Sequence, residues 1–211
     1  MKSIYGKKIG MTHIFDEKGK LVPVTVVAAG PCTVIQVKTA EKDGYSAIQI
    51  GLDEQKPKRL SKPLLGHFTK NNVKPFRLLR EIRTQGSETF TVGQTFGAEV
   101  LTGAQWVDVS GVSKGKGFQG VIKRHKNRGG DHGHGSMFYR APGSIGASSD
   151  PSRVIKGVKM PGQMGSENVT AIRLKLMKVD TERNLLLIRG AVPGANRSLV
   201  CVQACRRGGA Q

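Results

Sequence analysis

The sequence predicts a mainly β protein, an antiparallel barrel that is closed or nearly closed and that a long basic segment interrupts. Short runs rich in β-branched residues, separated by turn signals, recur along residues 1–110. The same pattern returns over residues 167–211. Many short strands at such spacing favour a barrel over a helical fold. Residues 111–166 lack this pattern, so we expect them to leave the barrel as one extended loop.

The first group of expected strands is bounded by turns that contain glycine. Gly30-Pro31 and Asp43-Gly44 are the clearest of these turn signals. The predicted strands of this group span residues 22–27, 33–37, 47–50 and 106–109.

A helical insertion at about 61–83 is expected within this first group. Phe76, Leu79 and Ile82 recur at helical spacing, which predicts a short helix over 75–83 with Pro75 in its first turn. We interpret His67, which precedes this helix, as a structural or phosphate-facing residue and not as a catalytic one.

The second group of strands follows the basic segment. Strands are predicted at 169–176, 184–188 and 198–204, with a hairpin turn at 180–184 between the first two. Cys201 and Cys205 lie four residues apart on the last strand, hence on one face, which favours small core residues over metal ligands. An odd total of three cysteines does not suggest a disulfide framework.

The charge of the chain predicts a polyanionic partner. Lys and Arg number 34 against 15 Asp and Glu, a formal net charge of +19 over 211 residues. Nucleic acid is the expected partner, and an anionic membrane surface is the weaker alternative. No apolar run approaches the roughly 18 residues of a membrane span, and no signal-type segment follows the N-terminus. We therefore expect a soluble protein of the cytoplasm, or of an organelle matrix, without membrane contact.

Residues 111–166 concentrate both glycine and charge. They contain 13 of the 28 glycines of the chain. Their 10 Lys or Arg residues, against two acidic residues, Asp131 and Asp150, give the segment a net charge of +8, and the rest of the chain carries the remaining +11. Such a composition cannot build a core of its own, so we expect another molecule to order the segment.

Three uses of this segment can be compared, and the first two fail. His125, Asp131, His132 and His134 offer metal ligands, but they lack a scaffold and compensating negative charge. Residues 111–117 fall one residue short of P-loop spacing and lack its final hydroxyl. Paired catalytic carboxylates are missing as well. We expect no metal, no cofactor, no small-molecule substrate and no catalytic residue.

Binding to RNA accounts for all features of the segment. Cations suit phosphates, glycines permit close backbone approach, and planar side chains such as Phe138 and Tyr139 stack on unpaired bases. The predicted RNA-binding residues are Lys114, Lys116, Phe118, Lys123, Arg124, His125, Lys126, Arg128, His132, His134, Arg140, Ser144, Arg153, Lys156, Lys159 and Gln163.

Several short motifs occur in order along nearly the whole chain. They are GKKIGMT at 6–12, DGY at 43–45, KP at 62–63, GHF at 66–68, VDVSG at 107–111, SKGKGF at 113–118, PGSIG at 142–146, MPGQMG at 160–165 and NLLLIRGAVPG at 184–194. Each motif is weak alone, but the ordered set is highly specific, and it resembles the L3 family of large-subunit ribosomal proteins in its bacterial-type form.

The resemblance implies a six-stranded barrel of the kind shared with translation factors. It further implies a structural protein that binds near the 3′ end of 23S-type rRNA beside neighbouring ribosomal proteins and nucleates large-subunit assembly. Residues 111–166 would then extend toward the peptidyl-transferase region. Ala147 departs from the family pattern, because many bacterial members carry a glutamine there that can be methylated.

Two alternatives remain open on the sequence. One is an enzyme acting on RNA with His132 and His134 as acid and base. The other is a free-standing RNA chaperone without sequence preference.

Overall fold

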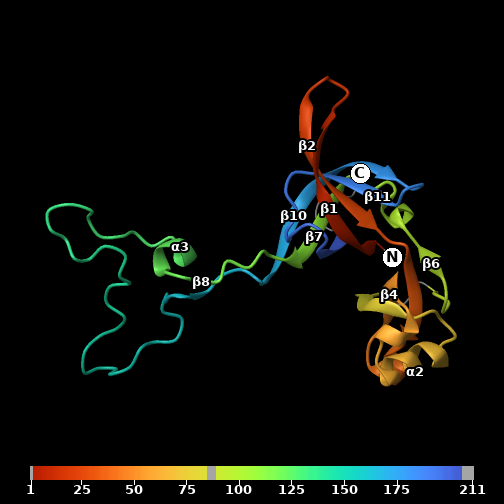
Figure 1. Ribbon diagram of the computed structural model, residues 1–211, viewed down its shortest axis with the longest axis horizontal. Helices are drawn as coiled ribbons and strands as arrows, with labels where there is room; N and C mark the ends of the chain where they lie inside the picture. The colour runs from red at the N-terminus through yellow and green to blue at the C-terminus, as the bar shows by residue number, and fades with distance from the viewer. Residues whose placement is uncertain (1, 85–88, 206–211) are drawn as a thin grey trace. The chain divides into compact units, whose positions relative to one another are not determined.

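The chain folds into two compact units (Figure 1). The computed structural model describes residues 2–84 and 89–205. The first unit comprises Met1–Gly111 and Val169–Gln211, and we call it the globular unit. The second comprises Val112–Asn168, and we call it the extension. Each unit is described by itself below.

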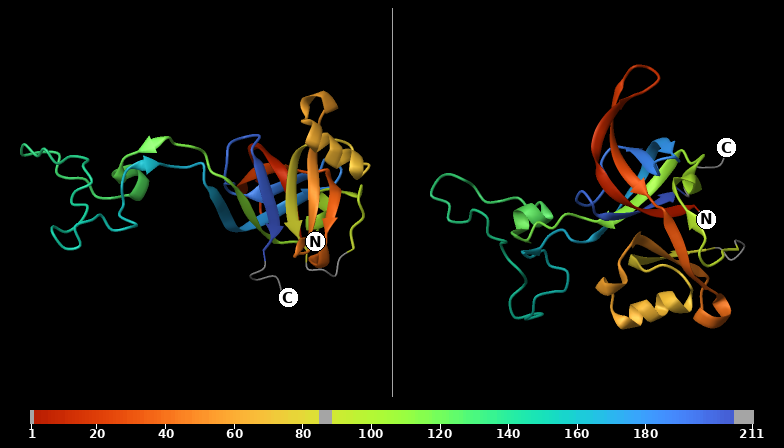
Figure 2. Two further views of the ribbon diagram at one scale, coloured as in Figure 1. Left: turned by 90° about the horizontal axis from the view of Figure 1, so that it is seen from below. Right: turned by 45° about the vertical axis from the view of Figure 1, so that its right-hand side comes forward.

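Six strands of the globular unit close into a barrel in the order β1-β12-β7-β10-β11-β2 (Figure 2). Their bounds are Ser3–Phe15 (β1), Leu21–Ala29 (β2), Trp106–Val112 (β7), Asn168–Asp180 (β10), Leu185–Arg189 (β11) and Leu199–Ala204 (β12). Ile4 lies opposite Val202, and Val27 lies opposite Leu186, and all four side chains are buried. The predicted mainly β class is confirmed, as are the strands at 22–27, 106–109 and 169–176 and the hairpin between β10 and β11.

A second sheet in the globular unit has the strand order β5-β4-β3-β6. Its strands are Cys32–Lys38 (β3), Ala47–Glu54 (β4), Phe76–Arg83 (β5) and Thr95–Phe96 (β6). The predicted strands at 33–37 and 47–50 therefore exist, but they lie in this sheet and not in the barrel. Short helical segments accompany the sheet at Ala40–Asp43 (α1), Pro57–Arg59 (η1), Lys62–Lys70 (α2) and Ala98–Leu101 (η2).

The predicted helix over 75–83 is wrong, because these residues form the edge strand β5. Phe76, Leu78 and Ile82 also fit the period-two spacing of a strand, and pairing with β4 places Ile82 opposite Ile48. The helix of this region is instead α2, which lies earlier in the predicted insertion and carries Pro63 in its first turn. Spacing alone could not separate the two possibilities, since the pairing partner lies far away in sequence.

One apolar core joins the barrel and the second sheet. Ile4, Val107 and Ile188 from the barrel belong to the same buried cluster as Val34 and Ile48 from the second sheet. A smaller cluster of Ile35, Phe68 and Phe76 fixes α2 to that sheet. His67 on α2 is half-buried, with its Nε2 2.7 Å from Oε1 of Gln49, which is a structural role.

Cys201 and Cys205 are not the buried core residues that the sequence predicted. On β12 the buried side chains are Val200 and Val202, so Cys201 takes the other face and is only half-buried, as is Cys205 after the strand. Register places Cys201 opposite Tyr5. Burial raises the pKa of the Cys32 thiol to about 12, so this buried cysteine is neutral at physiological pH and packs as a small apolar side chain. Within the described residues, no helix is both long and apolar enough to cross a membrane.

Candidate nucleic-acid interface

The extension begins and ends as a two-stranded ribbon. Its strands are Phe118–Gln119 (β8) and Gly162–Gln163 (β9), which pair antiparallel. Further backbone hydrogen bonds continue the pairing toward both ends of the unit, from Lys116 N to Met164 O at 2.9 Å and from Ser113 N to Glu167 O at 2.9 Å. The ribbon thus orders residues 113–119 against 162–167 within the chain itself, which the composition of the segment did not predict.

Gly165 allows the two strands of the ribbon to approach closely. Its φ is +76°, a conformation that side chains other than glycine rarely adopt. A Cβ atom at this position would also lie 2.1 Å from the carbonyl oxygen of Lys114, which is far inside van der Waals contact. Glycine is therefore required here by two independent constraints.

A short helix and two of its basic residues, Arg124 and His125, hold the far end of the ribbon together. The helix α3 spans Val121–His125, buries Val121, and ends where Lys126 takes a left-handed conformation. The Arg124 guanidinium donates from Nη1 to the carbonyl oxygen of Met160 at 2.8 Å, and His125 Nε2 lies 3.1 Å from the same oxygen. Both side chains are half-buried. These two predicted RNA-binding residues therefore join two segments of the extension.

The loop between α3 and β9 is exposed almost throughout. Every residue from Asp131 to Lys159 is exposed. A local chain reversal brings Gly130 N within 3.1 Å of Tyr139 O, and the His132 ring meets the Tyr139 ring edge-on with 4.1 Å between centroids. Two of the predicted stacking side chains therefore contact each other.

Apart from Arg124 and His125, the predicted RNA-binding residues are exposed. The Phe118 ring, for example, is 75% exposed. Ion pairs found among residues 2–84 and 89–205 join Lys7 to Asp53, Lys38 to Glu81 and Lys74 to Glu54, all within the globular unit. The cations of the extension are thus not paired with carboxylates in the described structure, and they are available to an external anion.

Sequence reasoning missed the apolar side chains that the extension exposes. Met137 is fully exposed, and Ile145, Val154 and Ile155 are about half exposed. Their signal was present, since a large apolar residue in a segment without a core has to face outward. Such exposed side chains mark contact surfaces when they gather in one segment.

A metal centre has no counterpart in the described geometry. Over residues 2–84 and 89–205, no group of three or more His, Cys, Asp or Glu side chains lies close enough together to hold a metal ion. His132, one of the three histidines considered as metal ligands, instead lies edge-on against the ring of Tyr139.

Comparison with known proteins identifies the family. Residues 83–185 match the family described as Ribosomal protein L3. The large ribosomal subunit protein uL3 of Carboxydothermus hydrogenoformans is 51% identical over 207 residues, which cover 98% of this chain and 99% of that protein. Because this identity extends over nearly the full length of both chains, the chain belongs to the ribosomal protein L3 (uL3) family.

Proposed function

We propose that this chain is a structural constituent of the large ribosomal subunit and that its extension binds rRNA. The observation that supports this most directly is the set of exposed cations in the extension, for which the described structure provides no carboxylate partner. A polyanion that threads along this unit would neutralise its self-repulsion and release counterions.

The shape of the loop supports an RNA partner in particular. Every residue of Asp131–Lys159 is exposed, and these residues include Phe138, Tyr139 and Met137. RNA recognition uses this combination of donors for phosphate and 2′-hydroxyl groups with flat or apolar surfaces for unstacked bases. The relative from Carboxydothermus hydrogenoformans is named as a protein of the large ribosomal subunit, which is where such an RNA is found.

The finer parts of the proposal come from the family resemblance. We propose that the barrel of the globular unit is of the translation-factor kind, and that this unit, residues 1–110 and 167–211, lies on 23S-type rRNA near its 3′ end and takes part in early assembly. Residues 111–166 would enter the rRNA toward the peptidyl-transferase region. Neighbouring ribosomal proteins would be its further partners. The protein would act in the large ribosomal subunit of the cytoplasm, and we assign it no catalytic step. Ala147 carries no glutamine amide, so modification at this position is not part of the proposal.

The test is an ultraviolet cross-linking map of the full chain on a large-subunit rRNA transcript, read by mass spectrometry and primer extension. Cross-links from Phe118, Phe138 and Tyr139 to a few discrete rRNA segments are expected, because these rings are exposed. A small-subunit rRNA transcript of similar length serves as the control. Equal and scattered cross-linking to both transcripts would contradict the proposal and favour an RNA chaperone without sequence preference. Cleaved or modified RNA would favour an enzyme.

A further inference from the structure

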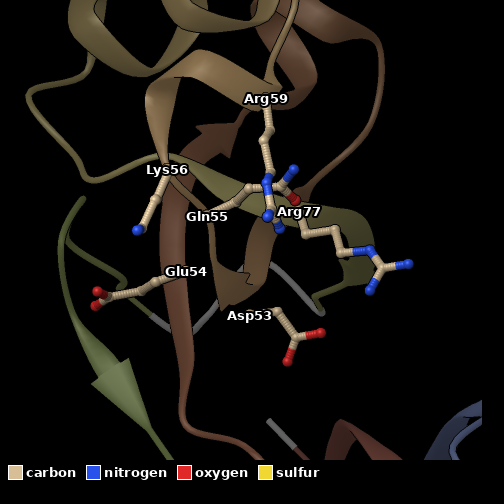
Figure 3. Close-up of a pocket in the computed structure, with 6 residues that line it drawn as sticks. All are labelled: Asp53, Glu54, Gln55, Lys56, Arg59 and Arg77. Carbon is tan, nitrogen blue, oxygen red and sulfur yellow. The ribbon is translucent and has the colours of Figure 1, made fainter.

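The globular unit has a polar hollow at the end of β4. Its residues precede the extension in the sequence and do not belong to it. Its volume is about 590 Å³, and it is lined by Asp53, Glu54, Gln55, Lys56, Arg59 and Arg77 (Figure 3). Sequence reasoning had assigned no function to any of these residues. All six side chains are polar, so the hollow offers hydrogen bonds and charge, and no apolar or aromatic residue lines it.

The two carboxylates of the hollow are already neutralised by lysines from outside it. Asp53 forms an ion pair with Lys7 on β1, and Glu54 forms one with Lys74 at 3.1 Å. The φ angle of Asp53 is +58°. Asp53 also lies between two β4–β5 residue pairs, Leu52 with Leu78 and Glu54 with Phe76, and it has no paired residue of its own on β5. The carboxylates are therefore engaged elsewhere and do not cancel the cations that line the hollow.

The three cations of the hollow, in contrast, have no carboxylate partner among the described residues. Lys56 caps the 3₁₀ segment η1 and Arg59 ends it, and a period of three residues places both on one side of that segment. Arg77 reaches the hollow from the edge strand β5, and all three side chains are exposed. Figure 3 shows Lys56 and Arg77 directed to opposite sides, with Arg59 between them.

The backbone beneath these cations is fixed by hydrogen bonds. Arg59 N donates to Lys56 O at 3.0 Å, which closes the turn of η1. Gln55 N donates to Pro75 O at 2.9 Å, which ties the end of β4 to the residue before β5. The two elements that carry the cations are thus held together, while the charged groups themselves stay free to bind a ligand.

We propose that this hollow binds backbone phosphates of rRNA and forms a second contact, on the globular unit, that is separate from the extension. The inference rests on the proposed function, since it takes the same rRNA as ligand. Two guanidinium groups favour phosphate because their planar donors match two phosphate oxygens at once. A protein partner would need buried apolar or aromatic anchors at the centre of its contact, and the hollow offers none.

The experiment compares the full chain with two variants of equal charge. The triple variant K56Q/R59Q/R77Q and the control K18Q/K20Q/K42Q each lower the net charge from +19 to +16. The control lysines are also exposed on the globular unit. Binding to a large-subunit rRNA transcript is measured over a series of salt concentrations, and hydroxyl-radical footprints are taken at saturation. Thermal melting checks that both variants are folded, and R77Q alone serves for footprinting if the triple variant is not.

The triple variant should lose one protected rRNA segment and keep the others. Three lost phosphate contacts should flatten the slope of log K against log salt by about 2 to 3, at about 0.7 to 0.9 for each contact. The control should keep all footprints and change the slope by less than one unit. Matching effects in both variants, or an unchanged footprint in the triple variant, would overturn the assignment of the hollow. Failure of the unmodified chain to bind the transcript would instead refute the proposed function.

Discussion

Replacing Arg124 with alanine should loosen the ribbon of the extension without affecting the barrel. The Arg124 guanidinium donates to Met160 O at 2.8 Å, and this bond links α3 to the segment that leads into β9. A hydrogen bond to a charged group contributes about 1.5 to 3 kcal/mol when it is made in full. Because Arg124 is only half-buried, the lower end of that range applies. A loss of about 1.4 kcal/mol corresponds to a tenfold change in an equilibrium constant.

Amide hydrogen exchange on the free protein measures this effect. The amides of Lys116 and Met164 donate across the ribbon, so both should exchange about tenfold faster in R124A. Amides of the barrel strands should keep their protection. K123A is the matched control, because Lys123 lies on the same helix but is exposed. R124K keeps the charge and an N–H donor on a shorter side chain, so it should fall between R124A and the unmodified chain. Equal exchange at Lys116 and Met164 in R124A and K123A would refute the role given to Arg124.

Two further outcomes are expected. Changing four exposed lysines of the extension to glutamine should flatten the slope of log K against log salt for rRNA binding by about 3, at about 0.7 to 0.9 for each phosphate contact. An unchanged slope would mean that the phosphate contacts lie elsewhere. The four are Lys114, Lys116, Lys123 and Lys126. Replacing residues 113–167 with a short Gly/Ser linker should leave a barrel that melts cooperatively, because Ser110 Oγ and Thr170 Oγ1 are 2.8 Å apart and a short connection can span the two strands. A chain that no longer folds after this replacement would show that the extension contributes to the core.

The sequence determined the features that depend on local composition. Runs rich in β-branched residues predicted β2, β7 and the hairpin between β10 and β11. The prediction succeeds because the side chains of a strand alternate between its two faces, so the pattern is visible within each strand's own residues. The concentration of glycine and charge at 111–166 likewise marked the segment that the structure separates as its own unit at Val112–Asn168. These properties can be predicted from neighbouring residues alone.

Tertiary structure decided which strand pairs with which and which charged groups are used internally. Residues 33–37 and 47–50 joined a second sheet, and 76–83 became its edge strand, because partners distant in sequence supplied the backbone hydrogen bonds. Arg124 and its neighbour His125 looked like the other basic residues of the extension, yet a carbonyl 36 positions away in sequence, that of Met160, holds the arginine. The sequence shows which side chains carry a charge. Only the folded chain shows whether an acceptor within the same molecule already binds a charged group.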